Sequence, residues 1–542
     1  MVQRKYINID GGYGYTQKGR NSYATAQELM DEMDRLGIWQ TVLEVHSGNT
    51  NAMHRNEKLL RDMVKLPDYK ERIIPAFSLD ICTLVQRGGV ERLIEMMKNY
   101  RPCCVALYPA DNSYRLRAAD MILEKISFLD PVILIDYNQL KTKDTSGDDL
   151  LYLAESFPNM RFVIRSFTTG GWPFVFDTVS RASNLYIDCS RIHTMDGVDI
   201  ACEYFGEDRV LYGQGILGDG GASMGTVEYA NISDEAKNKI CHGNFISLFS
   251  NPQEREFLTK NLRSMENKVA NSFWNTFLAG DGVKDAELYD AHTHLGFTAS
   301  YAPVYDLNFA DEIKSFEEDM ERFNIKKIVS TVTGIPDHRE AHEEKEAAVK
   351  GKEDRFKGYV RFNPNYLDIY TDEYLDERFA TGYYVGLKCL PSYMGYDIRD
   401  KRYEKMFQYA NDHHLPILIH TGTDGAGHGS PLKCAEAAAR YPNAKVILGH
   451  AGGRDVGRTQ CETLAKDPRY NNVYFEICGS FLCQRRWSES LEHIDYHRVL
   501  YGTDAPSHSI VFELARLLSE DIPDEQLRAI LGENAKELFG FE

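Results

Sequence analysis

The sequence predicts an α/β protein built as two tandem (β/α)8 TIM-barrel-like domains, and three observations support this fold class. The chain has 542 residues, which is too long for one ordinary core and suits two large domains. Short β-branched runs alternate with charged helical stretches through both halves. The two halves also resemble each other in sequence. We therefore expect one barrel in residues 1–275 and a second in residues 285–542.

An internal repeat relates the two halves. Five pairs of segments match in the same order, at spacings between 280 and 290 residues, which indicates an ancient duplication and fusion. We expect the boundary in residues 270–285, where Gly280-Asp281-Gly282 is typical of a linker. The matching pairs are 6–15 with 288–297, 105–107 with 385–387, 159–164 with 443–448, 209–213 with 498–502, and 243–244 with 533–534.

The second half contains eight strand candidates separated by helical stretches. Eight such units within about 250 residues are typical of a closed (β/α)8 barrel, whereas open doubly wound sheets rarely have eight. The candidates are 287–290, 327–333, 358–362, 385–389, 417–420, 445–449, 473–477 and 499–502.

Composition limits the classes of partner and the location. The net charge of −19 predicts no nucleic-acid partner and no binding to anionic membrane surfaces. The longest apolar runs are too short to span a bilayer, and the N-terminus has no secretory pattern. The 11 cysteines are scattered without a CxxC pair, which is typical of reduced thiols. We therefore expect a cytoplasmic protein.

Polar residues with metal-binding chemistry follow the predicted strands of the second half. In a (β/α)8 barrel the chemistry lies at these carboxyl ends. His292 and His294 are two residues apart, so in an extended segment both point toward the barrel axis and can bind one cation. His420 and Asp504 can complete the site from other strands. The residues at strand ends are His292, His294, Lys388, His420, His450 and Asp504.

Three imidazoles and one carboxylate favour Zn²⁺, with Mn²⁺, Fe²⁺ or Co²⁺ as other candidates. An open coordination position would hold water, whose pKa falls to roughly 7 from about 15.7 when such a metal binds it. We expect about one such ion per chain.

The motifs at the strand ends resemble those of the amidohydrolase superfamily, and most closely its amidohydrolase-2 branch of aminocarboxymuconate-semialdehyde decarboxylase-like enzymes. The resemblance covers essentially all of residues 285–542. The motifs are Asp290-Ala291-His292-Thr293-His294, Leu418-Ile419-His420-Thr421-Gly422, Leu448-Gly449-His450-Ala451-Gly452-Gly453, Leu500-Tyr501-Gly502-Thr503-Asp504 and Leu531-Gly532-Glu533-Asn534-Ala535.

The resemblance implies roles for these residues. His292, His294, His420 and Asp504 would bind the metal. His450 would polarise the substrate or carry a proton, and Asp504 would also serve as a base. In relatives with two metals a carboxylated lysine, here Lys388, bridges the ions; in relatives with one metal the histidine of the fifth strand joins the first ion.

Three further residues have open interpretations. Arg454 is predicted to pair with a substrate carboxylate, although a surface salt bridge is equally compatible with its position. His428 lies in the glycine-rich loop 422–429, which could approach a substrate or form an ordinary surface loop. Glu476 ends the seventh strand, and Asp188 takes this place in the first half, so a structural hydrogen-bonding role is expected.

The first barrel lacks the metal-binding set. Four of the 16 histidines lie in this half, and two carboxylates there could hold Ca²⁺ or Mg²⁺ only weakly. We expect a degenerate barrel without metal ligands that packs on the second barrel as a fused subunit partner; a flexible tether is the alternative, and a homodimer of the whole chain is compatible with both. The replacing residues are Asp10 and Gly12 for the histidine pair, Tyr108 for Lys388, Asp136 for His420, Ser166 for His450 and Gly215 for Asp504.

Three functions compete for this constellation. The first is hydrolysis of an amide, a lactone or a related C–N or C–O bond in a small molecule by metal-activated water. The second is non-oxidative decarboxylation or hydration of a small carboxylic acid at the same metal. The third is a non-catalytic scaffold of two barrels. An intact ligand set in one half favours an enzyme, and no residue identifies the substrate.

Overall fold

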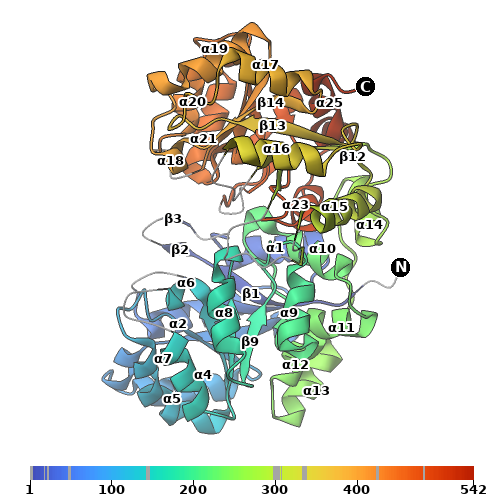
Figure 1. Cartoon of the computed structure of the whole chain (residues 1–542). Helices are drawn as coiled ribbons and strands as arrows, with labels where there is room; N and C mark the ends of the chain where they lie inside the picture. The colour runs from blue at the N-terminus through green and yellow to red at the C-terminus, as the bar shows by residue number, and fades with distance from the viewer. Residues whose placement is uncertain are drawn as a thin grey trace. The chain divides into compact units, whose positions relative to one another are not determined.

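The computed structural model describes residues 4–16, 19–20, 23–46, 50–141, 147–296, 305–306, 308–332, 338–422, 427–479 and 483–542. The chain divides into two compact units, Met1–Val269 and Ala270–Glu542 (Figure 1). Each unit contains an eight-stranded parallel sheet in which the strands follow one another in chain order. The predicted pair of (β/α)8 barrels is therefore confirmed.

The first sheet closes on itself between its first and last strands. The backbone N–H of Ile9 donates to the carbonyl of Tyr212 at 3.1 Å, just beyond the last strand. The strands are β1 (Ile7–Tyr13), β4 (Gln40–Val45), β5 (Ile73–Leu79), β6 (Cys104–Leu107), β7 (Val132–Asp136), β8 (Arg161–Arg165), β9 (Leu185–Asp188) and β10 (Val210–Leu211).

The second sheet closes in the same way, with the N–H of Ala291 donating to the carbonyl of Tyr501 at 3.0 Å. The strands are β11 (Leu288–Leu295), β12 (Ile325–Val332), β13 (Phe356–Arg361), β14 (Tyr384–Cys389), β15 (Pro416–His420), β16 (Lys445–Gly449), β17 (Val473–Glu476) and β18 (Val499–Leu500).

The largest difference from the predicted strand bounds lies in the first strand of the second barrel. The strand expected to end at residue 290 continues to Leu295, so His292 and His294 lie within β11 and not after it. The extension arises because β11 keeps pairing with β12 across an irregularity between Asp290 and Thr293, which brings His294 opposite Thr331. The two imidazoles are therefore held by a sheet.

Helices connect the strands, and local sequence sets their ends. In α1 (Ala26–Leu36) the hydroxyl of Thr25 accepts a hydrogen bond from the N–H of Glu28, and Gly37 ends the helix with φ 81°. In α15 (Phe309–Phe323) the side chain of Asn308 accepts from two N–H groups of the first turn, and Asn324 ends the helix with φ 59°.

The covering helices of the first unit are α1, α2 (Ala52–Met63), α4 (Gly89–Asn99), α5 (Asp120–Ile126), α7 (Gly147–Ser156), α8 (Trp172–Val179), α9 (Gly197–Phe205) and α10 (Ala222–Tyr229). Those of the second are α15, α16 (His338–Ala348), α17 (Asp372–Ala380), α19 (Glu404–Asp412), α20 (Pro431–Ala438), α21 (Asp455–Ala465) and α23 (Ile510–Leu518).

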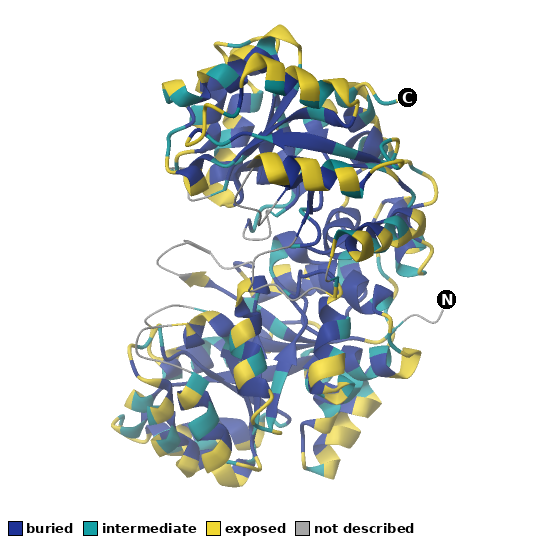
Figure 2. Ribbon diagram, in the orientation of Figure 1, coloured by how far each residue is buried: buried dark blue, intermediate teal, exposed yellow. Residues whose placement is uncertain are grey.

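Buried side chains fill the interior of each barrel. In Figure 2 the strands of both units are buried and the exposed residues lie mainly on the covering helices. The hydroxyl of Tyr359 crosses the second barrel and donates to the carbonyl of Ala291 at 2.8 Å. Both residues belong to the central core cluster, whose buried members are Tyr289, Ala291, Val329, Tyr359, Leu418, Ile447, Leu500 and Ala535.

Equivalent hydrogen bonds in the two barrels agree with the duplication predicted from sequence. The side-chain amide of Asn244 donates to the carbonyls of Glu207 and Val210, each at 2.7 Å. Asn534 makes the corresponding two bonds in the second barrel, to Tyr496 and Val499, also at 2.7 Å. The same frame has been kept in both copies.

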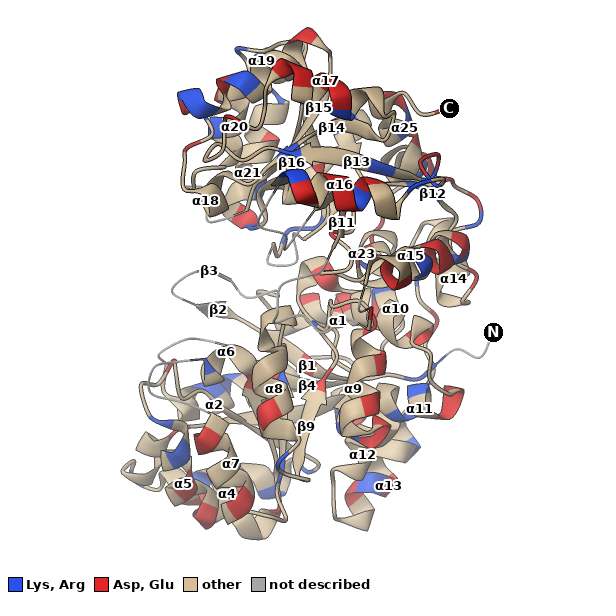
Figure 3. Cartoon of the chain, in the orientation of Figure 1, with Lys and Arg blue, Asp and Glu red and all other residues tan. Residues whose placement is uncertain are grey.

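Charged residues of both signs are interspersed along covering helices such as α16 (Figure 3). Within the described residues, no helix is long and apolar enough to cross a membrane.

Candidate metal centre

Three predicted ligands meet at the carboxyl ends of the second barrel's strands. Oδ1 of Asp504 lies 2.7 Å from Nε2 of His294 and 3.3 Å from Nε2 of His292. All three ligand atoms lie within 4.8 Å of one another. His292 is fully buried and His294 is 8% exposed, so the group sits at the bottom of the barrel mouth.

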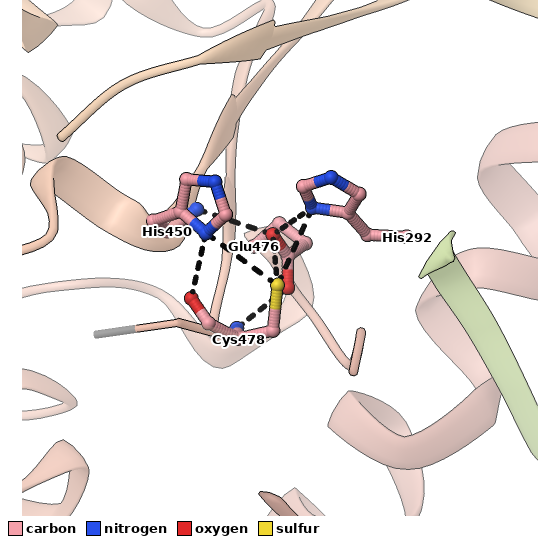
Figure 4. A group of neighbouring side chains, drawn as sticks. All are labelled: His292, His450, Glu476 and Cys478. Atoms are coloured by element: carbon pink, nitrogen blue, oxygen red, sulfur yellow. Dashed lines mark hydrogen bonds and ion pairs between the residues drawn. The ribbon is translucent and has the colours of Figure 1, made fainter. Parts of the chain in front are cut away.

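A second buried group surrounds the far nitrogen of His292. Figure 4 shows Glu476 and Cys478 between the imidazoles of His292 and His450. Nδ1 of His292 donates to Oε2 of Glu476 at 2.8 Å, and the same oxygen accepts from the backbone N–H of His450 at 3.1 Å. The Sγ of Cys478 lies 3.3 Å from Nδ1 of His292. The sequence pointed to Glu476 but gave no signal for Cys478.

These bonds allow a test of whether the residues fit a metal ion. Because Nδ1 of His292 donates to Glu476, its Nε2 presents a lone pair toward Asp504 and His294, as histidine ligands require. Nδ1 of His294 is buried and has no hydrogen-bond partner among the described residues. Two imidazole nitrogens and a carboxylate suit Zn²⁺ or Mn²⁺. The set therefore fits a divalent ion.

The electrostatic environment keeps these groups in the protonation states that metal binding needs. Burial alone would raise the pKa of Asp504, but His292 and His294 hold it well below its ordinary value. Burial lowers the pKa of His292 and of His294, which favours the neutral imidazoles that bind metal ions.

Lys388, predicted from the fourth strand, reaches the same place. Its Nζ lies 2.7 Å from Nε2 of His292, and its side chain is fully buried. Burial lowers the pKa of Lys388 to about 8, so the neutral amine forms more readily than in a surface lysine. A lysine at this distance is compatible with either role that the resemblance implies.

His420 and His450 form a pair beside this group. Nδ1 of His420 lies 2.9 Å from Nε2 of His450, and Nδ1 of His450 donates to the carbonyl of Cys478 at 3.1 Å. Burial lowers the pKa of His450 to about 4. Among the described residues, the sets whose ligand atoms lie within 4.8 Å of one another do not include His420. Its place as a metal ligand stays a prediction.

Unusual backbone conformations aim two of these side chains. His450 has φ 64° and Asp504 has φ 61°, in the left-handed region that non-glycine residues rarely adopt. The residues at the corresponding places in the first barrel share the feature, with φ 55° at Ser166 and φ 77° at Gly215. The conformation is therefore part of the duplicated frame.

Arg361 is a candidate site residue that sequence reasoning missed. It ends β13, is paired in register with Lys388, and lies two residues beyond the inward-facing Tyr359, so it points into the barrel mouth. Nη1 donates to the carbonyl of Val332 at 2.9 Å, and the buried Nε has no partner among the described residues. The sequence alone does not show that Arg361 is a neighbour of Lys388, because this depends on the register between β13 and β14.

The two predicted substrate-binding residues lie on loops. Arg454 is exposed and precedes α21, and His428 is exposed, with its carbonyl accepting from the N–H of Ile398 at 3.0 Å. Part of the glycine-rich loop, residues 423–426, lies outside the described residues. Substrate contact by Arg454 and His428 stays a prediction.

The first barrel is less empty than the sequence suggested. Glu44, His46 and Asp136 place ligand atoms within 4.8 Å of one another at the corresponding end of its strands. The comparison of the two halves overlooked Glu44, near the end of β4, and His46, which follows it, because the counterpart strand β12 supplies no predicted ligand.

Comparisons with known proteins assign the second barrel to a family. Residues 289–541 match the family model described as amidohydrolase. No curated protein matches the chain. Three solved structures with similarity to it are 5-carboxyvanillate decarboxylase from Sphingomonas paucimobilis (16% identity, 48% of this chain and 100% of that chain, TM-score 0.36), dihydroxybenzoic acid decarboxylase from Polaromonas sp. JS666 with bound manganese (15%, 47% and 97%, 0.35) and 2,6-dihydroxybenzoate decarboxylase from Rhizobium (16%, 47% and 99%, 0.35).

Proposed function

Because residues 289–541 belong to the amidohydrolase family, we propose that the second barrel is a divalent-metal-dependent enzyme that removes carbon dioxide from a small carboxylic acid. The observation that carries the proposal is the position of Arg361 beside the candidate metal ligands. Zn²⁺ or Mn²⁺ is the expected ion, at about one per chain.

Arg361 supports a carboxylate substrate because no acidic side chain in the described part of the chain neutralises its charge. Among the residues that the structure describes, no carboxylate forms an ion pair with it, and burial lowers its pKa below the ordinary value. A partly buried guanidinium without an acid is costly, and a bound carboxylate would offset that cost through two parallel hydrogen bonds.

The placement of Arg361 favours reaction at the carboxylate itself. Arg361 is the register neighbour of Lys388, whose Nζ contacts His292, so a carboxylate bound by Arg361 would lie next to the candidate metal ligands and not at a remote end of the substrate. Decarboxylation breaks the bond between this carboxylate and the adjoining carbon. The electron pair stays on that carbon, which then takes a proton, and no further reactant is consumed.

The charges of the site suit this step. A divalent ion there would act as a Lewis acid toward substrate oxygens. Lys388 and Arg361 add positive charge in a buried setting, where it stabilises a developing anion more strongly than in water. His450, held neutral and fixed by Cys478, can hold or move a proton through its Nε2.

Hydrolysis of an amide, a lactone or a related C–N or C–O bond, the leading expectation from sequence, is the second candidate. The observation that favours it is the ionised state of Asp504, which lies beside both histidines and could accept a proton from water. The scaffold alternative has no support from this arrangement, because a scaffold does not require buried, mutually repelling ionisable groups.

The test is to load the full-length protein with Zn²⁺ or Mn²⁺ and incubate it with a panel of hydroxylated or unsaturated carboxylic acids. Carbon dioxide release that is lost in the His292→Ala/His294→Ala variant would support decarboxylation. The same panel contains carboxylated lactones and amides, and ring opening or amine release without carbon dioxide would favour hydrolysis instead. A metal-loaded protein that does neither would refute both.

A further inference from the structure

The first barrel has an arginine, Arg165, at the position that corresponds to Gly449, next to the candidate metal centre of the second barrel. Arg165 ends β8 and is paired in register with Asp136, as Gly449 ends β16 opposite His420. A Cβ atom added at Gly449 would lie 3.5 Å from Cε1 of His292. A side chain at this position would therefore start in contact with one candidate ligand, His292, and also with the carbonyl of Ile419 at 3.1 Å and Cδ1 of Leu418 at 3.3 Å.

Arg165 occupies the corresponding position in the first barrel and is only 1% exposed. Its Nη2 lies 2.6 Å from Oε1 of Glu44 and 2.8 Å from Oδ1 of Asp136. Nη1 donates to the carbonyl of Ile9 at 3.1 Å. The guanidinium thus binds two carboxylates that reach it from different strands, as a bound cation would.

An imidazole from another strand end, that of His46, lies at this site. Gly12 stands where the second barrel has His294, and a Cβ atom added at Gly12 would lie 2.0 Å from Nε2 of His46. The imidazole of His46, which follows β4, therefore occupies the space of the missing side chain. Its Nε2 lies 2.9 Å from Oε1 of Glu44. The first barrel therefore has an imidazole, that of His46, at the place that corresponds to His294.

These replacements form a consistent ligand set. Glu44, His46 and Asp136 offer one nitrogen and two carboxylates with ligand atoms within 4.8 Å of one another. The hydroxyl of Tyr108, at the place of Lys388, donates to the other oxygen of Glu44 at 2.7 Å. One imidazole and two carboxylates suit Mn²⁺ or Zn²⁺.

We propose that Arg165 is a built-in cation that takes the place of a divalent ion in the first barrel, over a latent metal site formed by Glu44, His46 and Asp136. Buried carboxylates need a compensating cation, and the guanidinium supplies it. A divalent ion within a few ångströms of the guanidinium would be repelled and would lose two of its ligands to it. We therefore expect the first barrel of the native chain to bind no divalent ion.

The charges of Arg165 and Glu44 agree with this assignment. Burial alone would lower the pKa of Arg165, but Asp136, Glu44 and Asp10 raise it well above the ordinary value. Burial likewise opposes the charge on Glu44, and Arg165 is the strongest influence that lowers the pKa of this carboxyl. Arg165 and Glu44 therefore stabilise each other's charged forms, whereas burial raises the pKa of Asp136 despite the neighbouring guanidinium.

The experiment counts metal ions in the full-length chain with the second barrel's ligands removed by His292→Ala/His294→Ala. After equilibration with Mn²⁺ and removal of free ion, this background should hold no ion. Adding Arg165→Gly, which installs the residue of the second barrel, or Arg165→Ala should produce binding of about one Mn²⁺ per chain, because the three ligands become free. Arg165→Lys retains the charge and should bind none.

Two further measurements complete the test. Glu44→Gln added to the Arg165→Gly chain should abolish the new binding, which would locate it. If the Arg165 variants unfold without metal, Mn²⁺ should restore their circular dichroism, because binding stabilises the folded state. The proposal fails if folded Arg165→Gly and Arg165→Ala chains bind no ion, if unfolded ones are not restored, or if the background with intact Arg165 holds an ion that Glu44→Gln removes.

Discussion

Glu476 accepts a hydrogen bond from Nδ1 of His292 at 2.8 Å, deep beneath the candidate metal centre. The contact orients the imidazole and fixes which nitrogen carries the proton. We predict that Glu476→Gln lowers the affinity for the metal about 10- to 100-fold, as for other outer partners of ligand histidines. Titration with Zn²⁺ against a competing chelator measures this. The exposed Glu492→Gln is the control, and equal affinities in both variants would contradict the orienting role.

A second prediction concerns His450. Burial lowers its pKa to about 4, so it is neutral at neutral pH, with Nε2 beside His420. If His450 acts on the substrate, His450→Asn should lower turnover about 10²- to 10⁴-fold, the usual effect of losing an acid–base group, with metal content unchanged. Steady-state kinetics and metal analysis of the same preparation provide the two readouts. Loss of metal together with activity would identify His450 as a ligand instead.

Arg361 should contribute substrate affinity. We predict that Arg361→Met raises KM about 10- to 100-fold for a carboxylate substrate, since a charge-assisted hydrogen-bond pair contributes roughly 1.5–3 kcal/mol. The matched control is Arg355→Met. Arg355 is partly exposed, immediately precedes β13 and pairs with Glu321 at 2.9 Å. Similar KM values for both variants would remove Arg361 from the binding site.

A fourth prediction links stability to pH through Asp188 in the first barrel. Burial and the neighbouring Asp10 raise the pKa of Asp188 to about 8 from 3.8. The folded state therefore holds this proton more tightly than the unfolded chain, and its stability advantage declines as the pH rises from about 4 to about 8.

Asp188→Asn cannot titrate and can still accept the N–H of Ser166, which lies 2.8 Å from Oδ1. The Tm of the variant relative to the original chain should therefore increase as the pH is raised across this range. Asp208→Asn, at an exposed position, should show no such trend. A pH-independent difference for Asp188→Asn would show that this carboxyl is already ionised when folded.

The last prediction concerns the role of the first barrel as a permanent partner of the second. If it acts in this way, residues 270–542 expressed alone should be unstable or inactive, and residues 1–269 added in trans should restore activity, although less efficiently than the fused chain, because fusion raises the effective concentration.

The fragment begins at residue 270 because the side chain of Asn271 donates to the carbonyls of Leu518 at 2.9 Å and Glu520 at 2.7 Å, within the second unit. Activity, solubility and Tm are measured on both forms. A soluble fragment with full activity and unchanged Tm would leave the first barrel without this role.

The sequence predicted the parts of the site that depend on local order along the chain. Alternating strands and helices define the barrel, and residues at the ends of strands lie at one face of it, so His292, His294 and Asp504 could be grouped without coordinates. The extent of β11 could not be predicted, because its last residues are held by pairing with β12.

Residues that depend on the register between strands were missed for the same reason. Arg361 becomes a neighbour of Lys388 only through the pairing of β13 with β14. His46 enters the space above Gly12 from the adjoining strand, so a comparison of equivalent positions finds glycine and records a loss. A side chain that arrives from a different strand leaves no trace in such an alignment.

The left-handed backbone at His450, with φ 64°, has its counterpart at Ser166, with φ 55°. Such a conformation costs an ordinary residue about 1–2 kcal/mol. Because the barrel with the arginine-filled site retains it, selection for metal chemistry does not explain its presence there. The strained turn is thus common to both barrels, and it carries side chains of different chemistry, an imidazole in one and a hydroxyl in the other.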